Sequence, residues 1–430
     1  MINKKLSRIL GPILGVVLFM TSLGVGQVKA LADDKVSETS VTCENTSYDK
    51  EEDYSVKINK SVEQNGFKIT LDSAIATKNK LKILVKVESK ESIDKEKADN
   101  LISIVTFGKN LRDSSGYWND YKDDKTFFIN INEESDEEEF LEKDSLRVDI
   151  VIPTYKINIG IDADVDFSKS FKESVKKKMN AKIPEFDFTV NNIESDIMGT
   201  TINYSGPWIE NRFENDEPSD SPHSCIILQV GDKMYKAKRG GSSASKEDGT
   251  NGKFVCESLN YDKFKESEKI SIIPLVSYVS YDRLNELCKN EDRSEYYEKI
   301  NNYKEIKDNV RYLKSFDCYD GSKGEIYNIE RNDSTIKIYC KGNTEKAGLL
   351  MVTNMFIDYE VDVEKFNYED NYDCRKNMSF YKDANDELGY VVEFNNVPKD
   401  KTMDVNFDFN ISKIDKYEIG KEVELSNITV

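Results

Sequence analysis

Histidine is almost absent from this sequence, and its scarcity excludes several kinds of catalysis. The one histidine among 430 residues is His223, in the polar segment Ser-Pro-His-Ser-Cys. Metalloproteases of the H-E-x-x-H type and metal sites built from several histidines are therefore excluded. A Ser-His or Cys-His nucleophilic pair would have to use His223, which we interpret instead as a surface loop residue.

Cysteines are few, and their spacing is irregular. There are seven, and no two of them form a C-x-x-C motif, so neither a zinc ribbon nor a thioredoxin-like site is indicated. Because the count is odd, at least one thiol stays unpaired unless two chains join. Cys225 and Cys256 flank one long loop and form the disulfide pair most worth testing, with free thiols as the alternative.

Basic residues are outnumbered by acidic ones. The chain has 61 Lys and Arg against 80 Asp and Glu, a formal net charge of −19. We therefore expect no nucleic acid as a partner, because nucleic-acid binding needs a basic surface.

A long apolar run occurs only near the N-terminus. Lys4, Lys5 and Arg8 precede the apolar residues 9–26, and Ala30-Leu31-Ala32 supplies the small residues of a cleavage site. We expect a signal peptide at 1–32 and an extracellular or cell-surface protein. Its removal takes away four basic residues and no acidic one, which changes the net charge from −19 to −23. The alternative is an uncleaved anchor at 9–26, the only expected contact with a membrane.

Alternation of apolar and polar residues is abundant, and it predicts β-strands. In residues 54–89 apolar side chains recur at every second position, as in Phe67, Ile69 and Leu71. The dipeptide Asn65-Gly66 between two such runs favours a tight hairpin turn. This stretch therefore predicts an antiparallel meander of three strands.

The same pattern returns twice along the chain. Val190–Gly206 aligns without gaps on Ile326–Gly342, and the apolar spacing matches that of Leu71, Ala74 and Ile83. Each unit spans on the order of 100 residues, the size of an immunoglobulin-like sandwich. The predicted fold class is mainly β, with three tandem immunoglobulin-like β-sandwich domains and a helical insertion before the third.

Domain boundaries follow from shifts in composition. Apolar residues at steps of three and four, from Leu284 to Leu313, predict the helical insertion. The expected segments are a disordered acidic tether at 33–53, a first sandwich at 54–180, a second at 181–279, a helical connector at 280–315 and a third sandwich at 316–430.

Several of these residues carry a family likeness. The run Ile58-Asn-Lys-Ser-Val62, the turn Asn65-Gly-Phe67 and the strand 81–87 resemble the start of a domain of unknown function in Gram-positive extracytoplasmic proteins. Members are commonly labelled negative effectors of sigma factors, and immunoglobulin-like domains often follow. The resemblance implies a cell-envelope protein and offers no catalytic residues. Only Met1–Arg8 would lie inside the cell, too few residues to hold a sigma factor.

One segment has the spacing of a calcium-binding loop. Oxygen-bearing side chains stand at the ligand positions 1, 3, 5, 7, 9 and 12. These residues are Asp162, Asp164, Asp166, Ser168, Ser170 and Glu173. Position 6 is Phe167 instead of glycine, and alternating apolar residues give a strand as the simpler interpretation. Calcium is the one cofactor that the sequence suggests.

Three hypotheses for the function follow. The first is a non-catalytic binding or sensing protein whose partner is an extracytoplasmic protein or a cell-wall glycan. The second is a secreted carbohydrate-active hydrolase that uses paired carboxylates near Trp118, which lies in a polar segment and is able to stack on a sugar. The third is a structural spacer or a calcium-binding adhesin, and a spacer would have no concave binding surface.

Overall fold

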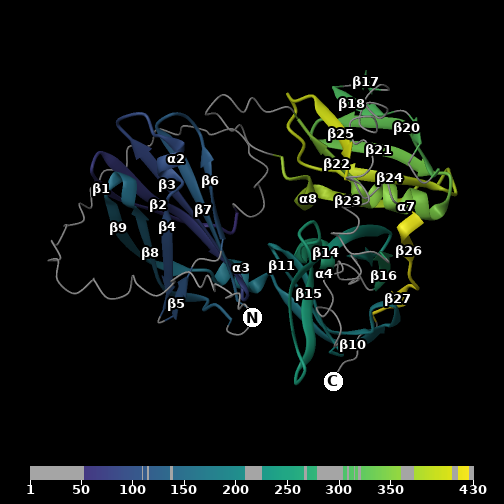
Figure 1. Cartoon of the computed structure of the whole chain (residues 1–430), viewed down its shortest axis with the longest axis horizontal. Helices are drawn as coiled ribbons and strands as arrows, with labels where there is room; N and C mark the ends of the chain where they lie inside the picture. The colour runs from purple at the N-terminus through teal and green to yellow at the C-terminus, as the bar shows by residue number, and fades with distance from the viewer. Residues whose placement is uncertain are drawn as a thin grey trace, which may run out of the picture. The chain divides into compact units, whose positions relative to one another are not determined.

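The structure is a computed structural model in which twelve segments of the chain are described (Figure 1). These segments are 53–108, 110–113, 116–135, 139–208, 225–265, 269–277, 304–307, 309–313, 315–317, 321–359, 372–408 and 415–425. The expected signal peptide and nearly all of the tether lie outside them, as do His223, Cys43, Cys288 and Cys318. Among the described residues, no helix has both the length and the apolar character needed to cross a membrane.

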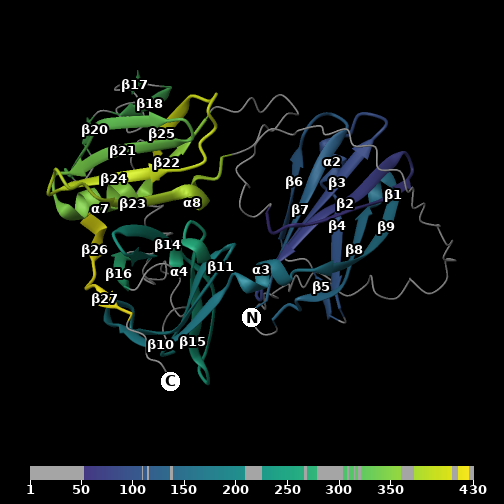
Figure 2. The same ribbon diagram turned by 180° about the vertical axis from the view of Figure 1, so that it is seen from behind.

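The first unit is a sandwich of two antiparallel sheets. Its larger sheet has the order β1-β2-β3-β7-β6 and its smaller sheet the order β5-β4-β8-β9, as Figures 1 and 2 show. The larger sheet consists of β1 (Val56–Gln64), β2 (Phe67–Ala76), β3 (Lys80–Ser89), β7 (Thr126–Glu134) and β6 (Gly116–Tyr121). The smaller sheet consists of β5 (Asn110–Asp113), β4 (Ile102–Phe107), β8 (Lys143–Ile152) and β9 (Ile157–Asp166). Short helices α2 (Lys95–Ala98), η1 (Pro153–Tyr155) and α3 (Ser168–Lys172) connect strands.

Alternation along these strands builds the core of the first unit. Ile69, Val85 and Phe127 of the larger sheet belong to the same buried cluster as Val105 and Val148 of the smaller one. Burying one such side chain stabilises a fold by about 1.5 to 3 kcal/mol. The tight turn at Asn65-Gly66 has positive φ at both residues, as the sequence predicts. The mainly β fold class is therefore confirmed.

Larger sheets of the same order occur in the second and third units. The second has the order β10-β11-β12-β15-β14, and the third the order β19-β20-β21-β24-β23. In the second unit these strands are β10 (Val175–Ile183), β11 (Phe188–Asp196), β12 (Gly199–Gly206), β15 (Gly249–Cys256) and β14 (Lys233–Ser245). In the third they are β19 (Ser315–Asp317), β20 (Lys323–Asn332), β21 (Thr335–Gly342), β24 (Gly389–Phe394) and β23 (Met378–Lys382).

The central hairpins of all three units share one irregularity. A β-bulge interrupts the register at Leu71–Ser73, at Val190–Asn192 and at Ile326–Asn328. The second and third of these positions coincide in the ungapped sequence alignment, and the first has the same apolar spacing. Apolar residues on either side of the bulge are three positions apart, as in Leu71 and Ala74, and the extra residue lets both face the core. The repeat seen in the sequence is therefore a repeat of backbone geometry.

The smaller sheets of the second and third units are assembled differently. The remaining strands of the second unit are β13 (Cys225–Val230) and β16 (Ile270–Ser277), with the short helices η2 (Pro184–Phe186) and α4 (Tyr261–Lys265). The smaller sheet of the third unit has β17 (Lys304–Lys307), β18 (Val310–Leu313), β25 (Met403–Phe407) and β22 (Met355–Asp358), and its helices are α7 (Glu345–Asn354) and α8 (Cys374–Asn377).

The third unit is nested within the second. In the first unit β8 pairs with β9, the strand that directly follows it. In the second unit, β16 pairs instead with the C-terminal strands β26 (Tyr417–Ile419) and β27 (Val423–Glu424). The strands that complete the second unit therefore follow the third unit in the sequence. The order of the units along the chain is not purely consecutive, because the second unit has two separate parts.

Two expected boundaries need correction. β10 begins at Val175 and pairs with β11, so the second unit begins inside the range 54–180 that we assigned to the first sandwich. The helical stripe was expected to extend to Leu313, but residues 304–313 form the hairpin β17-β18. Apolar residues in so short a segment fit both periods, and pairing of β18 with β25 selects the strand. Residues 278–303 of the connector lie outside the described residues.

Deletion of residues 415–430 tests the nested arrangement. It removes the buried side chains Tyr417 and Leu425 and the bond from the Leu425 amide to the Ile270 carbonyl (2.9 Å). We expect a loss of about 2 to 5 kcal/mol in the free energy of unfolding. In hydrogen exchange, amides of β16 should lose protection while those of β8 in the first unit stay unchanged. Full protection of β16 in the truncated chain would contradict the arrangement.

Candidate functional site

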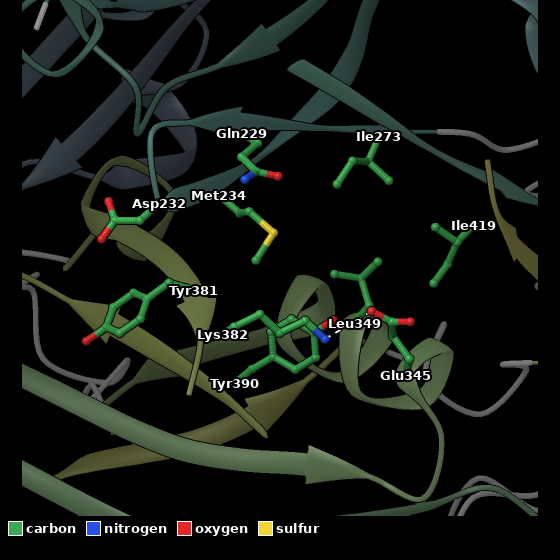
Figure 3. Close-up of a pocket in the computed structure, with 10 residues that line it drawn as sticks. All are labelled: Gln229, Asp232, Met234, Ile273, Glu345, Leu349, Tyr381, Lys382, Tyr390 and Ile419. Atoms are coloured by element: carbon green, nitrogen blue, oxygen red, sulfur yellow. Dashed lines mark hydrogen bonds and ion pairs between the residues drawn. The ribbon is translucent and has the colours of Figure 1, made fainter. Parts of the chain in front are cut away.

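A cavity lies between the second unit and the nested third unit. Its volume is about 520 Å³, and Figure 3 shows the side chains that surround it. The lining residues are Gln229, Asp232, Met234, Ile273, Glu345, Leu349, Tyr381, Lys382, Tyr390 and Ile419. Because Ile419 belongs to β26, the C-terminal strand contributes to the wall as well as to the sheet.

Two tight connections place the side chains of this cavity. The hairpin β13-β14 turns at Gly231-Asp232, where Gly231 has φ +65°, and this turn sets Asp232 at the tip and Met234 just after it. On the other side α7 begins at its N-cap Thr344, whose hydroxyl accepts a bond from the Ala347 amide. Glu345 and Leu349 are four residues apart, so they share the face of α7 that borders the cavity.

The polar side of the cavity is organised around Lys382. Its ammonium lies 3.0 Å from Glu345 Oε1 and 4.1 Å from the centre of the Tyr390 ring. Burial opposes the charged form of Lys382, but the bonds with Tyr390 and Glu345 prevail and raise its pKa. The site therefore presents a fixed cation beside an aromatic ring, with Met234, Ile273 and Leu349 as its apolar side.

An ion pair joins the two units beside the cavity. Lys233 Nζ on β14 lies 2.9 Å from Glu393 Oε1 on β24, and Lys337 Nζ lies 3.7 Å from the other carboxylate oxygen. Burial acts to raise the pKa of Glu393, but hydrogen bonds from Lys233 and Asn395 lower it overall. The strands β14 and β23 pair at Met234 and Phe380, which makes the two larger sheets continuous.

Lys236 forms a second connection between the units. Its ammonium donates to the Thr353 carbonyl (2.7 Å) and to Asn354 Oδ1 (3.2 Å) at the end of α7. Carbonyls at a helix C-terminus lack partners within the helix, so a cation is favourable there. Burial nevertheless lowers the pKa of Lys236. This lysine fixes the helix that carries Glu345 and Leu349.

The first residues of the possible calcium loop form a strand in the structure, as the simpler interpretation of the sequence predicts. Asp162, Asp164 and Asp166 lie on one exposed side of β9. Arg147 Nη1 is 2.9 Å from Asp162 Oδ2, and Lys143 Nζ is 2.8 Å from Asp166 Oδ2. The latter pairing, with bonds from Ser168, lowers the pKa of Asp166.

The three remaining residues of the possible calcium loop follow the strand β9. Ser168 and Ser170 belong to α3, where buried Ser170 donates to the Ala76 carbonyl, and Glu173 follows the helix. Among the described residues, no group of three or more His, Cys, Asp and Glu side chains is placed to hold a metal ion. The strand is the correct interpretation, because Ala163, Val165 and Phe167 are buried between the acids.

Of the two alternatives for Cys225 and Cys256, the structure has free thiols and no disulfide between them. Both are free thiols, and they pack into different hydrophobic clusters. Cys225 is the first residue of β13 and Cys256 is the last residue of β15, and each of these strands pairs with β14. Burial raises the pKa of both thiols, so they stay protonated and act as small apolar groups.

Trp118 is exposed on the edge strand β6, with 44% of its surface accessible. Its indole donates to Asp120 Oδ2 (3.1 Å), and burial raises the pKa of Asp120. A second carboxylate, Asp99, accepts bonds from Asn119 and Tyr121, the residues that alternate with Trp118 and Asp120 along the strand. The two acids therefore contact opposite sides of β6. This geometry does not bring them together as a hydrolase pair.

Sequence reasoning missed the cavity residues. Lys382, Glu345 and Tyr390 carry no local motif, and they meet residues 229–234 only through the nested topology. Thr344 followed by Glu345 was the one available signal, because threonine before an apolar run indicates a helix N-terminus.

Comparisons with known proteins give distant likenesses only. No protein-family model matches the sequence, and no curated protein matches it. A conserved domain protein from Bacillus anthracis is 16% identical, with 54% of this chain and 82% of that chain covered and a TM-score of 0.37. The cycloalternan-forming enzyme from Listeria monocytogenes, solved with a pentasaccharide substrate, is 6% identical, with 82% and 29% covered and a TM-score of 0.15. Neither likeness bears on function.

Replacement of Lys236 by methionine tests the connection at α7. Because burial holds the folded-state pKa of Lys236 below 10.5, the unfolded chain binds more protons, and the unfavourable effect of this lysine decreases as pH rises toward 10.5. The free energy of unfolding of the wild type should therefore increase relative to that of Lys236→Met as pH rises toward 10.5. Urea denaturation of the two proteins at each pH measures this difference in the free energy of unfolding.

Lys238→Met is the matched control, since Lys238 is an exposed lysine on the same strand. Its stability should follow the wild type at every pH. Parallel pH profiles for the wild type and Lys236→Met would show that Lys236 is not held in a desolvated site.

Proposed function

We propose that this protein is a non-catalytic binding or sensing protein that works outside a Gram-positive cell and takes its ligand in the cavity between the second and third units. The observation that carries the proposal is one cavity of about 520 Å³ to which the host unit, the nested unit and the C-terminal strand all contribute. Small-molecule sites commonly have volumes of about 300 to 1,000 Å³ and occur between domains. The cavity favours binding over a spacer role.

The composition of the cavity supports a ligand with an apolar body and a polar end. Met234, Ile273 and Leu349 supply apolar surface, while Gln229 and the Lys382–Glu345 pair supply hydrogen-bonding groups. None of the ten lining residues is a serine, threonine, cysteine or histidine. The lining therefore holds no Ser-His or Cys-His nucleophilic pair, and Lys382 has Glu345 as its carboxylate partner.

Location and family are part of the same proposal. The signal-peptide pattern at 1–32 supports secretion or surface attachment, with anchoring by residues 9–26 as the alternative. Membership of the extracytoplasmic family is proposed on the resemblance of Ile58–Val62, Asn65–Phe67 and the strand 81–87. A partner in that compartment would be an envelope protein, a cell-wall glycan or a smaller envelope molecule.

Blocking the cavity tests the proposal. Ile419 is a partly exposed residue at its wall, and Ile419→Trp should fill part of the space. The mature chain would be used to capture material from Gram-positive envelope fractions, with identification by mass spectrometry. We expect a defined set of molecules whose retention falls at least about tenfold in Ile419→Trp, which corresponds to about 1.4 kcal/mol of lost affinity.

Ile102→Trp serves as the control, because Ile102 is an exposed isoleucine on the first unit. It should retain the same molecules as the wild type, and the melting temperatures of both variants should stay close to that of the wild type. The proposal would be overturned if the wild type and both variants retained the same molecules equally, or if none of the three proteins retained any molecule.

A further inference from the structure

The outer face of the larger sheet of the first unit carries an exposed aromatic platform, separate from the cavity. Trp118 and Asp120 of β6 lie opposite Asn130 and Phe128 of β7, and these lie opposite Leu84 and Lys86 of β3. We call these six residues the Trp118 face. The residues that alternate with them, including Tyr121, Ile129 and Val85, are buried on the other side. The sheet therefore displays the six side chains together on one rigid surface.

A hydrogen bond holds the Trp118 ring of this face in place. Asp120 Oδ2 accepts from Trp118 Nε1 at 3.1 Å and from Asn130 Nδ2 at 2.8 Å. The hydrogen bond from the indole N–H to Asp120 lies in the plane of the ring, so it leaves the π surface of the ring free. Because 44% of Trp118 is exposed while its position is fixed, little conformational entropy remains to be lost when a ligand stacks on it.

The chemistry of this face fits a sugar. The ring offers a flat apolar surface for the C–H side of a pyranose, while the neighbouring amide, carboxylate and ammonium groups can bond hydroxyls. Three of the six side chains, Asp120, Asn130 and Lys86, are polar or charged, whereas the centre of a protein interface is depleted of charged residues. The net charge of −19 repels anionic polymers. We infer that the Trp118 face binds a neutral polysaccharide.

Affinity electrophoresis of the intact mature chain tests this inference. Native gels would contain glycol chitin, hydroxyethylcellulose, glucomannan or dextran as neutral polysaccharides and polygalacturonate as the anionic comparison. We expect at least one neutral polysaccharide to retard the wild type, and Trp118→Ala to lose that retardation by at least about tenfold in affinity. Ile102→Ala, which removes another exposed apolar residue of the same unit, should behave like the wild type.

Fluorescence provides an independent readout. Trp118 and Trp208 are the two tryptophans of the chain, so Trp208→Phe leaves Trp118 as the one reporter. Its emission should change when the retarding polysaccharide is added. Retardation by none of the neutral polysaccharides, equal retardation of Trp118→Ala, or retardation by polygalacturonate alone would each overturn the inference. So would capture of proteins in the absence of any polysaccharide binding.

Discussion

The pairing of β16 with the C-terminal strands β26 and β27 is the constraint on which the second half of the structure depends. In the first unit the strand beside β8 follows it after a short turn, so the smaller sheet forms from local sequence. In the second unit the other edge of β16 pairs with residues 417–419 and 423–424, which follow the third unit in the sequence. An uncovered edge would expose unpaired backbone groups. The second unit is therefore completed by strands that come after the third unit in the sequence.

This constraint explains why the second and third units share a core. One buried cluster includes Ile227, Met234 and Leu275 from the host and Ile338, Leu350 and Val392 from the nested unit. At its edge the ion pair Lys233–Glu393 and the lysine Lys236 connect the units through charged groups that are partly buried. Such groups are costly to bury without partners, so they favour one relative placement of the strands. The cavity lies beside these contacts.

Much of the local fold was predictable from the sequence. Alternation predicted the strands, Asn65-Gly66 predicted the first hairpin, and the three-residue spacing of Leu71 and Ala74 recurred where each bulge is found. These features depend on neighbouring residues. The aspartates at 162, 164 and 166 matched a metal loop in spacing alone, and the buried residues between them were the better guide.

Contacts between distant residues were not predictable in this way. Cys225 and Cys256 pack into different hydrophobic clusters, although their positions in the sequence flank one predicted loop. Val310 fits a helical period in the sequence, and only its pairing with Met403 shows that it belongs to a strand.

The most direct test of the nested arrangement is a disulfide between two introduced cysteines, Ser277→Cys and Tyr417→Cys, in a chain whose native cysteines are replaced by alanine. Ser277 and Tyr417 are paired residues of β16 and β26. We predict that mass spectrometry finds this link in high yield and no link for Ser277→Cys with Val423→Cys. Equal yields for the two pairs would contradict the nested arrangement.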